Sequence, residues 1–449
     1  MQETNRLFID SQTFSELDIF GSHGVGKNLF DMINHCTTNG GEDKLKRLFK
    51  RPKNNIREIE AIQETVKYFT ENLKNWNLPV SKEQMNAVEV YFFSKPDPLS
   101  SDNIFLKFLE GAWLKFSHKS YNEVFRKGTK NAIKTLICLK DFIEIKNSDD
   151  LPIYLKEIFN SISEFLSNDK INKLIKDQEY VSLGFLKALN IDKIFRDKLK
   201  VDFSLFIDLI YELDLLMAMA TATKKYKLVF PKFVDRTESY IEINDLYHIF
   251  LDKPIKNNIL FDEGKNFMFM TGPNMAGKTT LLSSVGLAVF MSHLGLGVPA
   301  NSMSLSAFNC IFSSMNPSGN ISIGYSYFFS EVMRVKNAAL TLKKHSKVLM
   351  LLDELFKGTN IKDAIDGSLL VIDGLTNWKS SVFILASHLT ELENDIRQKS
   401  NILFNYFDSD VKEGKPIFNF KLLEGVSHKR LGLLIIKDQK LDLLLDPEK

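Results

Sequence analysis

The sequence predicts a mixed α/β domain over residues 231–449, preceded by a mainly α-helical domain over residues 1–230. Up to about residue 230, apolar side chains recur at helical spacing. Residues 203–217 carry them around most of the circumference, which is typical of a buried helix. From Phe230 and Pro231 onward the pattern changes to short alternating runs, and then to apolar runs separated by helix-compatible segments. That alternation is typical of a parallel sheet with crossover helices.

The segment Thr-Gly-Pro-Asn-Met-Ala-Gly-Lys-Thr-Thr at residues 271–280 fits the pattern G-x-x-x-x-G-K-T. An apolar run precedes it and a helix-compatible run follows, so it is predicted to connect a strand to a helix. Glycines at two positions let backbone N–H groups point toward an anion, and the helix N-terminus adds partial positive charge. We therefore predict a nucleotide phosphate site formed by Gly272, Pro273, Asn274, Met275, Ala276, Gly277, Lys278, Thr279 and Thr280.

Two residues of this segment have specific expected roles. Lys278 is predicted to reach the β- and γ-phosphates, and the Thr279 hydroxyl to join the ligand shell of Mg²⁺. A similar segment at residues 21–28 ends in Asn28, which lacks the hydroxyl that magnesium needs. No acidic strand follows nearby, so we predict that this segment is a loop.

Two further apolar runs end in polar side chains that suit hydrolysis. Residues 347–354 end in Asp353 and Glu354, and residues 381–387 are followed by His388. The carboxyl ends of parallel strands face the ligand crevice. We therefore expect Asp353 to hold Mg²⁺ through water and Glu354 to orient and deprotonate the attacking water. His388 is expected to contact the γ-phosphate or that water, with a structural role as the alternative.

A glycine- and serine-containing segment, Gly-Tyr-Ser-Tyr-Phe-Phe-Ser-Glu at residues 324–331, precedes a helix-compatible run. Ser326 lies near the start of that helix, where N–H groups and the helix dipole attract anions. The segment resembles the signature segment of ABC-type ATPases. That resemblance implies that Ser326 acts in trans on a nucleotide held by a second subunit, in a dimer with two sandwiched nucleotides. The residues alone fit a simple capped helix equally well.

Together these segments resemble the ATPase domain of the MutS family of DNA mismatch-repair proteins. The resemblance is carried by residues 271–280, Val298-Pro299-Ala300, residues 324–331, the run DELFKGTN at 353–360 and the run ASHLTEL at 386–392. It implies that Lys278 and Thr279 bind phosphate and magnesium, Ser326 acts in trans, Asp353 and Glu354 form the acidic pair, and His388 is a switch histidine. It also implies that Asn257 belongs to a loop beside the adenine.

The resemblance continues upstream and also has departures. Residues 8–69, most clearly residues 36–49, resemble the opening of the family's helical core domain, and residues 212–226 resemble the close of its lever. We expect no mismatch-reading domain ahead of the core, a helical half too short for the full DNA clamp, and little room for a dimerisation tail at 431–449. Phe356-Lys357 replaces the usual glycine-arginine, and Asp363-Ala364 the usual aspartate-glycine. These departures bear on mismatch recognition rather than on nucleotide chemistry.

The composition indicates a soluble globular protein. Its 449 residues are 44% hydrophobic and 25% charged, and the net charge of +2 means that nucleic-acid affinity must come from local patches. The densest basic stretch, residues 44–53, is interleaved with apolar residues and is predicted to be an amphipathic helix. Three separated cysteines and a polar N-terminus predict a cytoplasmic protein. Residues 280–330 carry no charge, and we expect a helix buried against the sheet rather than a membrane span.

The sequence therefore predicts an ATPase with ATP and Mg²⁺ as cofactors, which forms a homodimer through its ATPase domains. Hydrolysis at composite dimer sites is expected to regulate its grip on mismatched or otherwise non-standard DNA. The alternative is a nucleotide-gated protein-interaction module of the same fold, without mismatch recognition. A third reading, the motor of an ABC transporter, is disfavoured because the sequence offers no true membrane span.

Overall fold

The computed structural model describes residues 6–21, 27–93, 119–176, 185–315, 327–412 and 415–427. The chain folds into two units, which we describe separately. The larger contains residues 1–32, 49–60 and 225–449, and the smaller contains residues 33–48 and 61–224. The division therefore differs from the sequence-based boundary at residue 230. Periodicity could not assign the N-terminal segment to the larger unit, because it joins a sheet there through a strand of only two residues.

The larger unit contains a seven-stranded sheet with the order β1-β7-β8-β9-β5-β10-β11. These strands are β1 (Phe8–Ile9), β5 (Phe267–Thr271), β7 (Cys310–Ser314), β8 (Val348–Asp353), β9 (Val382–Ala386), β10 (Ile402–Lys412) and β11 (Lys415–Glu424). All neighbouring strands are parallel except β10 and β11, which form an antiparallel hairpin. β5, β7, β8 and β9 are buried along their whole length, which explains their continuous apolar runs.

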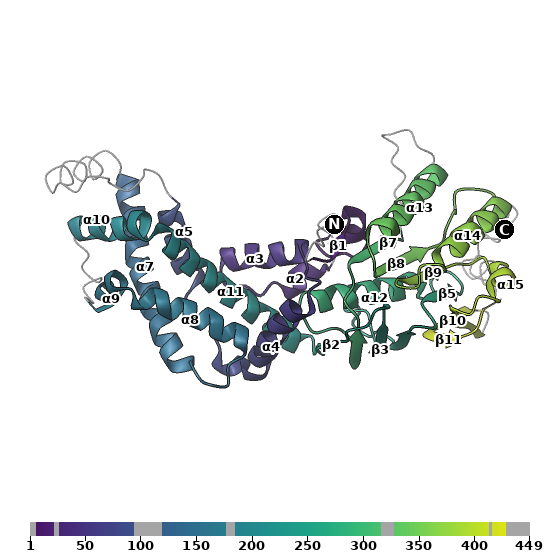
Figure 1. Cartoon of the computed structure of the whole chain (residues 1–449), viewed down its shortest axis with the longest axis horizontal. Coiled ribbons are helices and arrows are strands. Elements are labelled where there is room, and N and C mark those ends of the chain that lie inside the picture. The colour runs from purple at the N-terminus through teal and green to yellow at the C-terminus, as the bar shows by residue number, and fades with distance from the viewer. Residues whose placement is uncertain are drawn as a thin grey trace, which may run out of the picture. The chain divides into compact units, whose positions relative to one another are not determined.

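Helices cover both faces of this sheet (Figure 1). α13 (Tyr327–Lys344), α14 (Ile361–Leu375) and α15 (Leu392–Ile396) pack on one face, in a core that includes Phe269, Met350 and Leu385. α12 (Lys278–His293) lies on the other face together with the segment that follows α1 (Ser11–Glu16). A Cβ on Gly286 of α12 would lie 2.8 Å from side-chain atoms of Leu17 and Leu351, so a larger residue there would require these leucine side chains to shift.

α12 is buried on almost all sides, which accounts for its lack of charged residues after Lys278. This confirms the prediction of a helix buried against the sheet. Among the helices that the structure describes, none is long and apolar enough to cross a membrane.

A second, four-stranded sheet of the larger unit has the order β2-β6-β3-β4. Its strands are β2 (Lys232–Phe233), β3 (Ile241–Leu246), β4 (Asn257–Phe261) and β6 (Ser302–Leu305). Ile241 and Ile243 are buried while Glu242 between them is not, as the alternating sequence predicts. β4 also contacts β11 of the larger sheet, and this contact positions one of the predicted site residues.

The smaller unit is helical. Its elements are α5 (Lys82–Phe92), α7 (Lys119–Lys146), α8 (Ile153–Ser167), α9 (Asp169–Lys176), α10 (Phe185–Lys193), the π-helical turn η3 (Ile194–Lys198) and α11 (Lys200–Lys225). Four elements precede these in the chain: α2 (Leu29–Ile33), α3 (Asn39–Lys50), α4 (Ile56–Asn72) and the 3₁₀ turn η1 (Leu73–Asn75). Residues of α3 and of α4 belong to both units. Asp214 of α11 is buried and accepts hydrogen bonds from the backbone N–H groups of Thr37 and Thr38 at 2.8 and 2.7 Å. The carboxylate thereby fixes the start of α3.

Candidate functional site

The loop that joins β5 to α12 adopts backbone angles that favour glycine. Gly272 has φ +143° and Gly277, the N-cap of α12, has φ +108°. A Cβ on Gly272 would also lie 3.0 Å from the carbonyl oxygen of Phe407. The first N–H groups of α12 have no intrahelical acceptor, so the loop places free donors and the positive end of a sixteen-residue helix together. This arrangement suits an anion.

Lys278 is the first residue of α12 and is only 5% exposed. Its Nζ donates to the carbonyl oxygens of Gly272 at 2.8 Å and Pro273 at 3.2 Å. Burial lowers the pKa of Lys278, while the nearby carboxylates of Glu354 and Asp353 act in the opposite direction. Because hydrogen bonds between ions are stronger than those to neutral carbonyls, a phosphate oxygen would be a better partner for this ammonium.

Thr279 and Asp353 meet where α12 begins and β8 ends. The Thr279 hydroxyl donates to Asp353 Oδ2 at 2.5 Å. Burial raises the pKa of Asp353, and the hydrogen bond from Thr279 acts against it. Within the described residues, the buried Asp353 Oδ1 has no hydrogen-bond partner. A hydroxyl and a carboxylate with an unused oxygen are the ligands that Mg²⁺ prefers, so these two side chains fit a magnesium site.

Glu354 follows β8 with φ +53°, and its N–H donates to the carbonyl oxygen of Ala386 in β9 at 2.8 Å. This bond turns the side chain toward Lys357 Nζ, 3.0 Å from Glu354 Oε2, and toward His388 Nδ1, 3.3 Å from the same oxygen. Burial alone would raise the pKa of Glu354. Hydrogen bonds from His388 and Lys357 outweigh that effect and lower the pKa to about 2. The carboxylate is therefore ionised throughout the neutral range.

These groups surround a cavity of about 370 Å³. Its lining consists of Pro273, Asn274, Met275, Gly277, Lys278, Thr279, Thr280, Asp353, Glu354, Lys357 and Phe420. Most of the predicted phosphate-loop residues thus lie together with both predicted carboxylates. Ala276 is buried behind the loop, and His388 reaches the site through Glu354. Ser326 lies outside the residues that the structure describes.

A second cavity of about 360 Å³ adjoins the same loop. Its mostly apolar lining consists of Leu246, Tyr247, His248, Leu251, Lys253, Ile255, Asn257, Gly277, Thr280, Leu281, Ser284, Phe407 and Phe420. Gly277, Thr280 and Phe420 also line the first cavity, so the two cavities are neighbours. An apolar cavity beside an anion site has the character of a nucleobase pocket.

Asn257 lies at this second cavity, but its amide group is used by β11. Its Nδ2 donates to the carbonyl oxygen of Phe420 at 3.1 Å, and its Oδ1 accepts from the N–H of Leu422 at 2.8 Å. Asn257 therefore fixes the backbone of Phe420, whose φ is +53°. Sequence reasoning missed Phe420 and named Lys357 only as a departure from the family pattern. No motif marks a phenylalanine in a strand, whereas a lysine three residues after Glu354 could have been recognised as its ion-pair partner.

The geometry agrees with comparisons to known proteins. Residues 268–442 match MutS domain V. The matched range contains the glycine loop of 272–277, Asp353, Glu354 and His388. Asn257 lies outside it.

Three curated relatives are named "DNA mismatch repair protein MutS". The protein of Anaplasma phagocytophilum (strain HZ) is 30% identical over 240 residues, which cover 52% of this chain and 28% of that protein. The protein of Lysinibacillus sphaericus (strain C3-41) is 28% identical over 233 residues, covering 50% and 26%. That of Oceanobacillus iheyensis is 26% identical over 277 residues, covering 59% and 31%. The matches thus span less than a third of each relative. Together with the domain V match, they show that about half of this chain is similar to MutS proteins.

Proposed function

We propose that this chain binds ATP with Mg²⁺ at the loop between β5 and α12 and hydrolyses it. One observation carries the proposal: Lys278, Thr279, Asp353 and Glu354 line one cavity, although they come from two separate parts of the chain. Phosphoryl transfer to water requires a cation for the phosphates, oxygen ligands for Mg²⁺ and a carboxylate for the attacking water, and these side chains supply them.

The described residues supply distinct parts of the reaction. The N–H groups at the start of α12 bind phosphate oxygens, and Lys278 exchanges its two carbonyl partners for the β- and γ-phosphates. Thr279 and Asp353 hold Mg²⁺, which neutralises charge on the phosphates when bound. The base occupies the apolar cavity, where the ring of Phe420 and the side chain of His248 contribute to the wall.

Glu354 orients the attacking water. A carboxylate with a pKa of about 2 accepts a hydrogen bond from water but is a weak base. Its contact with His388 must therefore lengthen before it takes a proton efficiently, while Lys357 keeps the carboxylate in position. Movement of the His388 ring away from Glu354 toward the γ-phosphate would raise the basicity of Glu354 when ATP is bound. His388 then acts as a switch.

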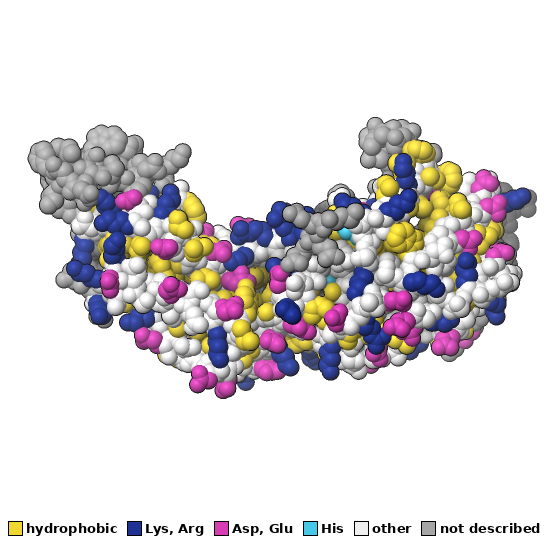
Figure 2. All heavy atoms as spheres, in the orientation of Figure 1, with side chains coloured by type: hydrophobic (Ala, Val, Ile, Leu, Met, Phe, Trp, Pro, Cys, Tyr) yellow, Lys and Arg dark blue, Asp and Glu magenta, His cyan; other side chains and the backbone are white. Residues whose placement is uncertain are grey.

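We further propose that two copies of the chain associate through their ATPase domains, with Ser326 of each acting on the nucleotide of the other. The apolar side chains on the outer side of α13 support an interface. Phe329, Val332 and Leu340 are 41%, 36% and 52% exposed, and Figure 2 shows apolar side chains gathered over α13 and α14. Exposed apolar patches of this kind mark protein contacts. ATP-driven association would regulate the grip of the protein on mismatched or otherwise non-standard DNA, in keeping with the names of its relatives.

Phosphate release from the purified chain tests the proposal. We expect Mg²⁺-dependent release that is lost in Lys278→Ala, and a Ser326→Ala variant that binds ATP but hydrolyses it slowly. Dimers should appear in size-exclusion chromatography with a slowly hydrolysed ATP analogue. Binding to mismatched, branched and fully paired duplexes at a fixed salt concentration then tests the proposed binding to DNA. Phosphate release no faster than that of Lys278→Ala would overturn the proposal, and turnover indifferent to every DNA would favour a protein partner.

A further inference from the structure

Helix α13 carries two buried charged side chains that take no direct part in the proposed chemistry. Glu331 is 4% exposed and Arg334 is 7% exposed. They are three residues apart and so lie on neighbouring positions of one helix face. Burying a charge costs free energy unless it is paired and hydrogen-bonded, so the partners of these two side chains indicate what α13 is held against.

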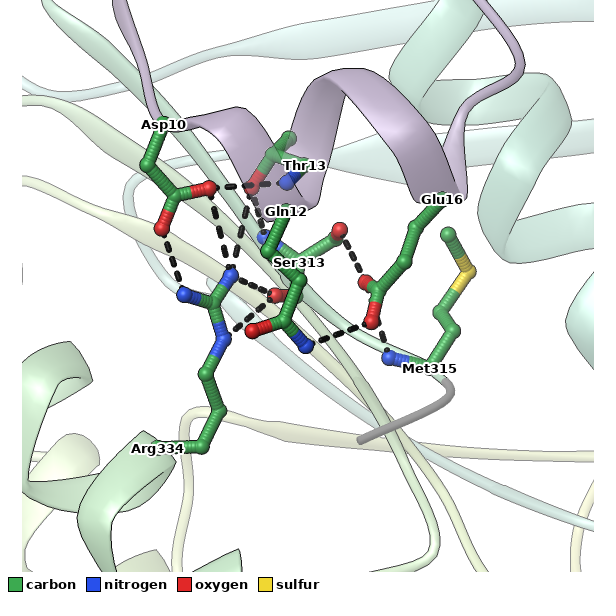
Figure 3. Close-up of polar contacts among 7 residues, drawn as sticks. All are labelled: Asp10, Gln12, Thr13, Glu16, Ser313, Met315 and Arg334. Carbon is green, nitrogen blue, oxygen red and sulfur yellow. Dashed lines mark hydrogen bonds and ion pairs between the residues drawn. The ribbon is translucent and has the colours of Figure 1, made fainter. Parts of the chain in front are cut away.

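Arg334 connects α13 to the start of α1 and to the end of β7 (Figure 3). Its Nη1 pairs with Asp10 Oδ2 at 2.5 Å, and its Nε donates to the carbonyl oxygen of Ser313 at 3.0 Å. Asp10 is the N-cap of α1 and also accepts from the N–H of Thr13 at 2.8 Å. Burial would raise the pKa of Asp10, but hydrogen bonds from Arg334 and Thr13 hold it below its usual value. The pair is therefore ionised.

The other end of α1 holds the residues that end β7. Glu16 Oε2 accepts from the N–H of Met315 at 3.0 Å and from the Ser313 hydroxyl. Gln12 donates to Glu16 Oε1 at 2.8 Å, which steadies the carboxylate (Figure 3). Glu16 of α1 thus contacts the end of β7 at Ser313 and at Met315. Arg334 connects α1 and β7 to α13 through Asp10 and Ser313.

Glu331 connects the same helix to the proposed catalytic loop. Its two carboxylate oxygens accept from the backbone N–H groups of Lys357 and Gly358, each at 3.1 Å. The side chain of that lysine makes the 3.0 Å ion pair with Glu354. A continuous set of contacts therefore runs from Asp10 through α13 to the carboxylate that orients water.

We propose that Asp10, Arg334 and Glu331 are positioning residues for hydrolysis: the N-terminal segment fixes α13 through the Asp10–Arg334 pair, and Glu331 of α13 fixes the loop that sets the distance between Lys357 and Glu354. The proposal rests on the proposed ATPase function. It gives residues 6–16 a role in turnover, although they lie more than 250 residues from the loop in the sequence. None of the three side chains lines the nucleotide cavities.

The test compares the parent with Asp10→Asn, Arg334→Met and Glu331→Gln. Glutamine keeps one acceptor oxygen but turns an N–H₂ group toward the second backbone N–H, so the loop shifts while the fold remains. Each variant is measured for thermal unfolding, for binding of a fluorescent ATP analogue, and for kcat and KM of phosphate release. We expect kcat to fall roughly 10- to 100-fold, with KM for ATP changed less than about threefold, because small misplacement of a catalytic group costs rate rather than binding.

A matched control is available in the smaller unit. Arg196 and Asp192 form a buried ion pair at 2.5 Å, with side chains 4% and 3% exposed. Arg196→Met breaks a comparable pair that has no contact with α13, and it should leave kcat within about twofold of the parent.

The comparison of kcat with KM and with thermal unfolding separates positioning from general destabilisation. A mispositioned variant unfolds near the temperature of the parent and binds the ATP analogue normally, but releases phosphate slowly. An active parent whose folded Asp10→Asn and Glu331→Gln variants keep their kcat within twofold would overturn the proposal. If Asp10→Asn does not fold, the kcat of Glu331→Gln alone tests the proposal. A parent that releases no phosphate would instead refute the proposed function.

Discussion

The hydroxyl of Thr279 donates a 2.5 Å hydrogen bond to Asp353, and so joins the first turn of α12 to the end of β8. The two residues are 74 positions apart in the chain. Within the described part of the chain, the second oxygen of the Asp353 carboxylate has no hydrogen-bond partner despite its burial. An unsatisfied buried carboxylate oxygen is costly, and a divalent cation would satisfy it.

Replacing Thr279 by valine should therefore weaken metal binding more than nucleotide binding. We expect the Mg²⁺ concentration for half-maximal phosphate release to rise on the order of 10-fold or more, because one of the two side chains proposed to hold the ion loses its oxygen. Magnesium titrations at saturating ATP measure this. Thr279→Ser keeps the hydroxyl and serves as the control; an unchanged magnesium requirement in Thr279→Val would exclude Thr279 as a ligand.

Glu354→Gln should bind ATP and fail to hydrolyse it. Glutamine can still contact the water but cannot accept its proton, so phosphate release should fall roughly 10²- to 10⁴-fold. The nucleotide-bound dimer should then persist, which size-exclusion chromatography in ATP detects. Lys278→Ala is the contrasting variant, since it should lose ATP binding itself. Rapid hydrolysis by Glu354→Gln would show that a residue other than Glu354 accepts the proton from water.

Lys357→Met should make hydrolysis more sensitive to acid. The ion pair with Lys357 is one of the two contacts that hold the pKa of Glu354 near 2, below its ordinary 4.5. A depressed carboxylate pKa stabilises the folded state above pH 4.5, and this stability is lost as the pH falls toward 2. Without Lys357 the pKa rises, so the rate begins to fall at higher pH and the acid-dependent loss of stability from Glu354 shrinks. Profiles of kcat and of urea unfolding between pH 3 and 8 measure both effects.

Acid should also destabilise the fold through His293. Its Nε2 accepts from the N–H of Phe308 at 3.1 Å, so the ring proton is on Nδ1, which lies 2.6 Å from the carbonyl oxygen of Lys53. Burial lowers the pKa of His293 from 6.5 to about 4. The unfolded chain therefore takes up a proton at a higher pH than the folded protein does.

Stability linked to His293 is thus complete above pH 6.5 and declines as the pH falls toward 4. The loss amounts to about 3 kcal/mol in full, from the size of the pKa difference. Urea unfolding at several pH values measures it. His293→Gln should unfold more easily at pH 7.5 and flatten the profile between pH 7 and 5. Identical slopes for parent and variant would show that the pKa of His293 is the same in the folded and unfolded states.

Local patterns in the sequence predicted the central part of the site. The apolar run at 266–270 corresponds to β5, the acidic pair follows β8, and His388 follows β9, since each depends only on a strand and the residues after it. Parallel topology predicted that Glu354 and His388 lie at the same edge of the sheet. Their direct contact and the lowered pKa of Glu354 required the structure.

The remaining contacts depend on long-range packing that leaves no periodic signal. Arg334 and Asp10 are 324 residues apart, and β1 is too short to be recognised as a strand. Phe420 reaches the cavities because β11 folds back on β10, whose pairing shifts register between Phe407 and Ser409. Asn257 was predicted beside the adenine, and the structure adds that its amide is bonded to β11.

The ring of Phe420 belongs to the walls of both cavities. In the proposed complex, the same side chain would touch the heterocycle and border the triphosphate. Base selectivity and the rate of hydrolysis would then both depend on this one side chain. A substitution that admits guanine would change turnover as well, and restoring the original rate would need a second substitution elsewhere.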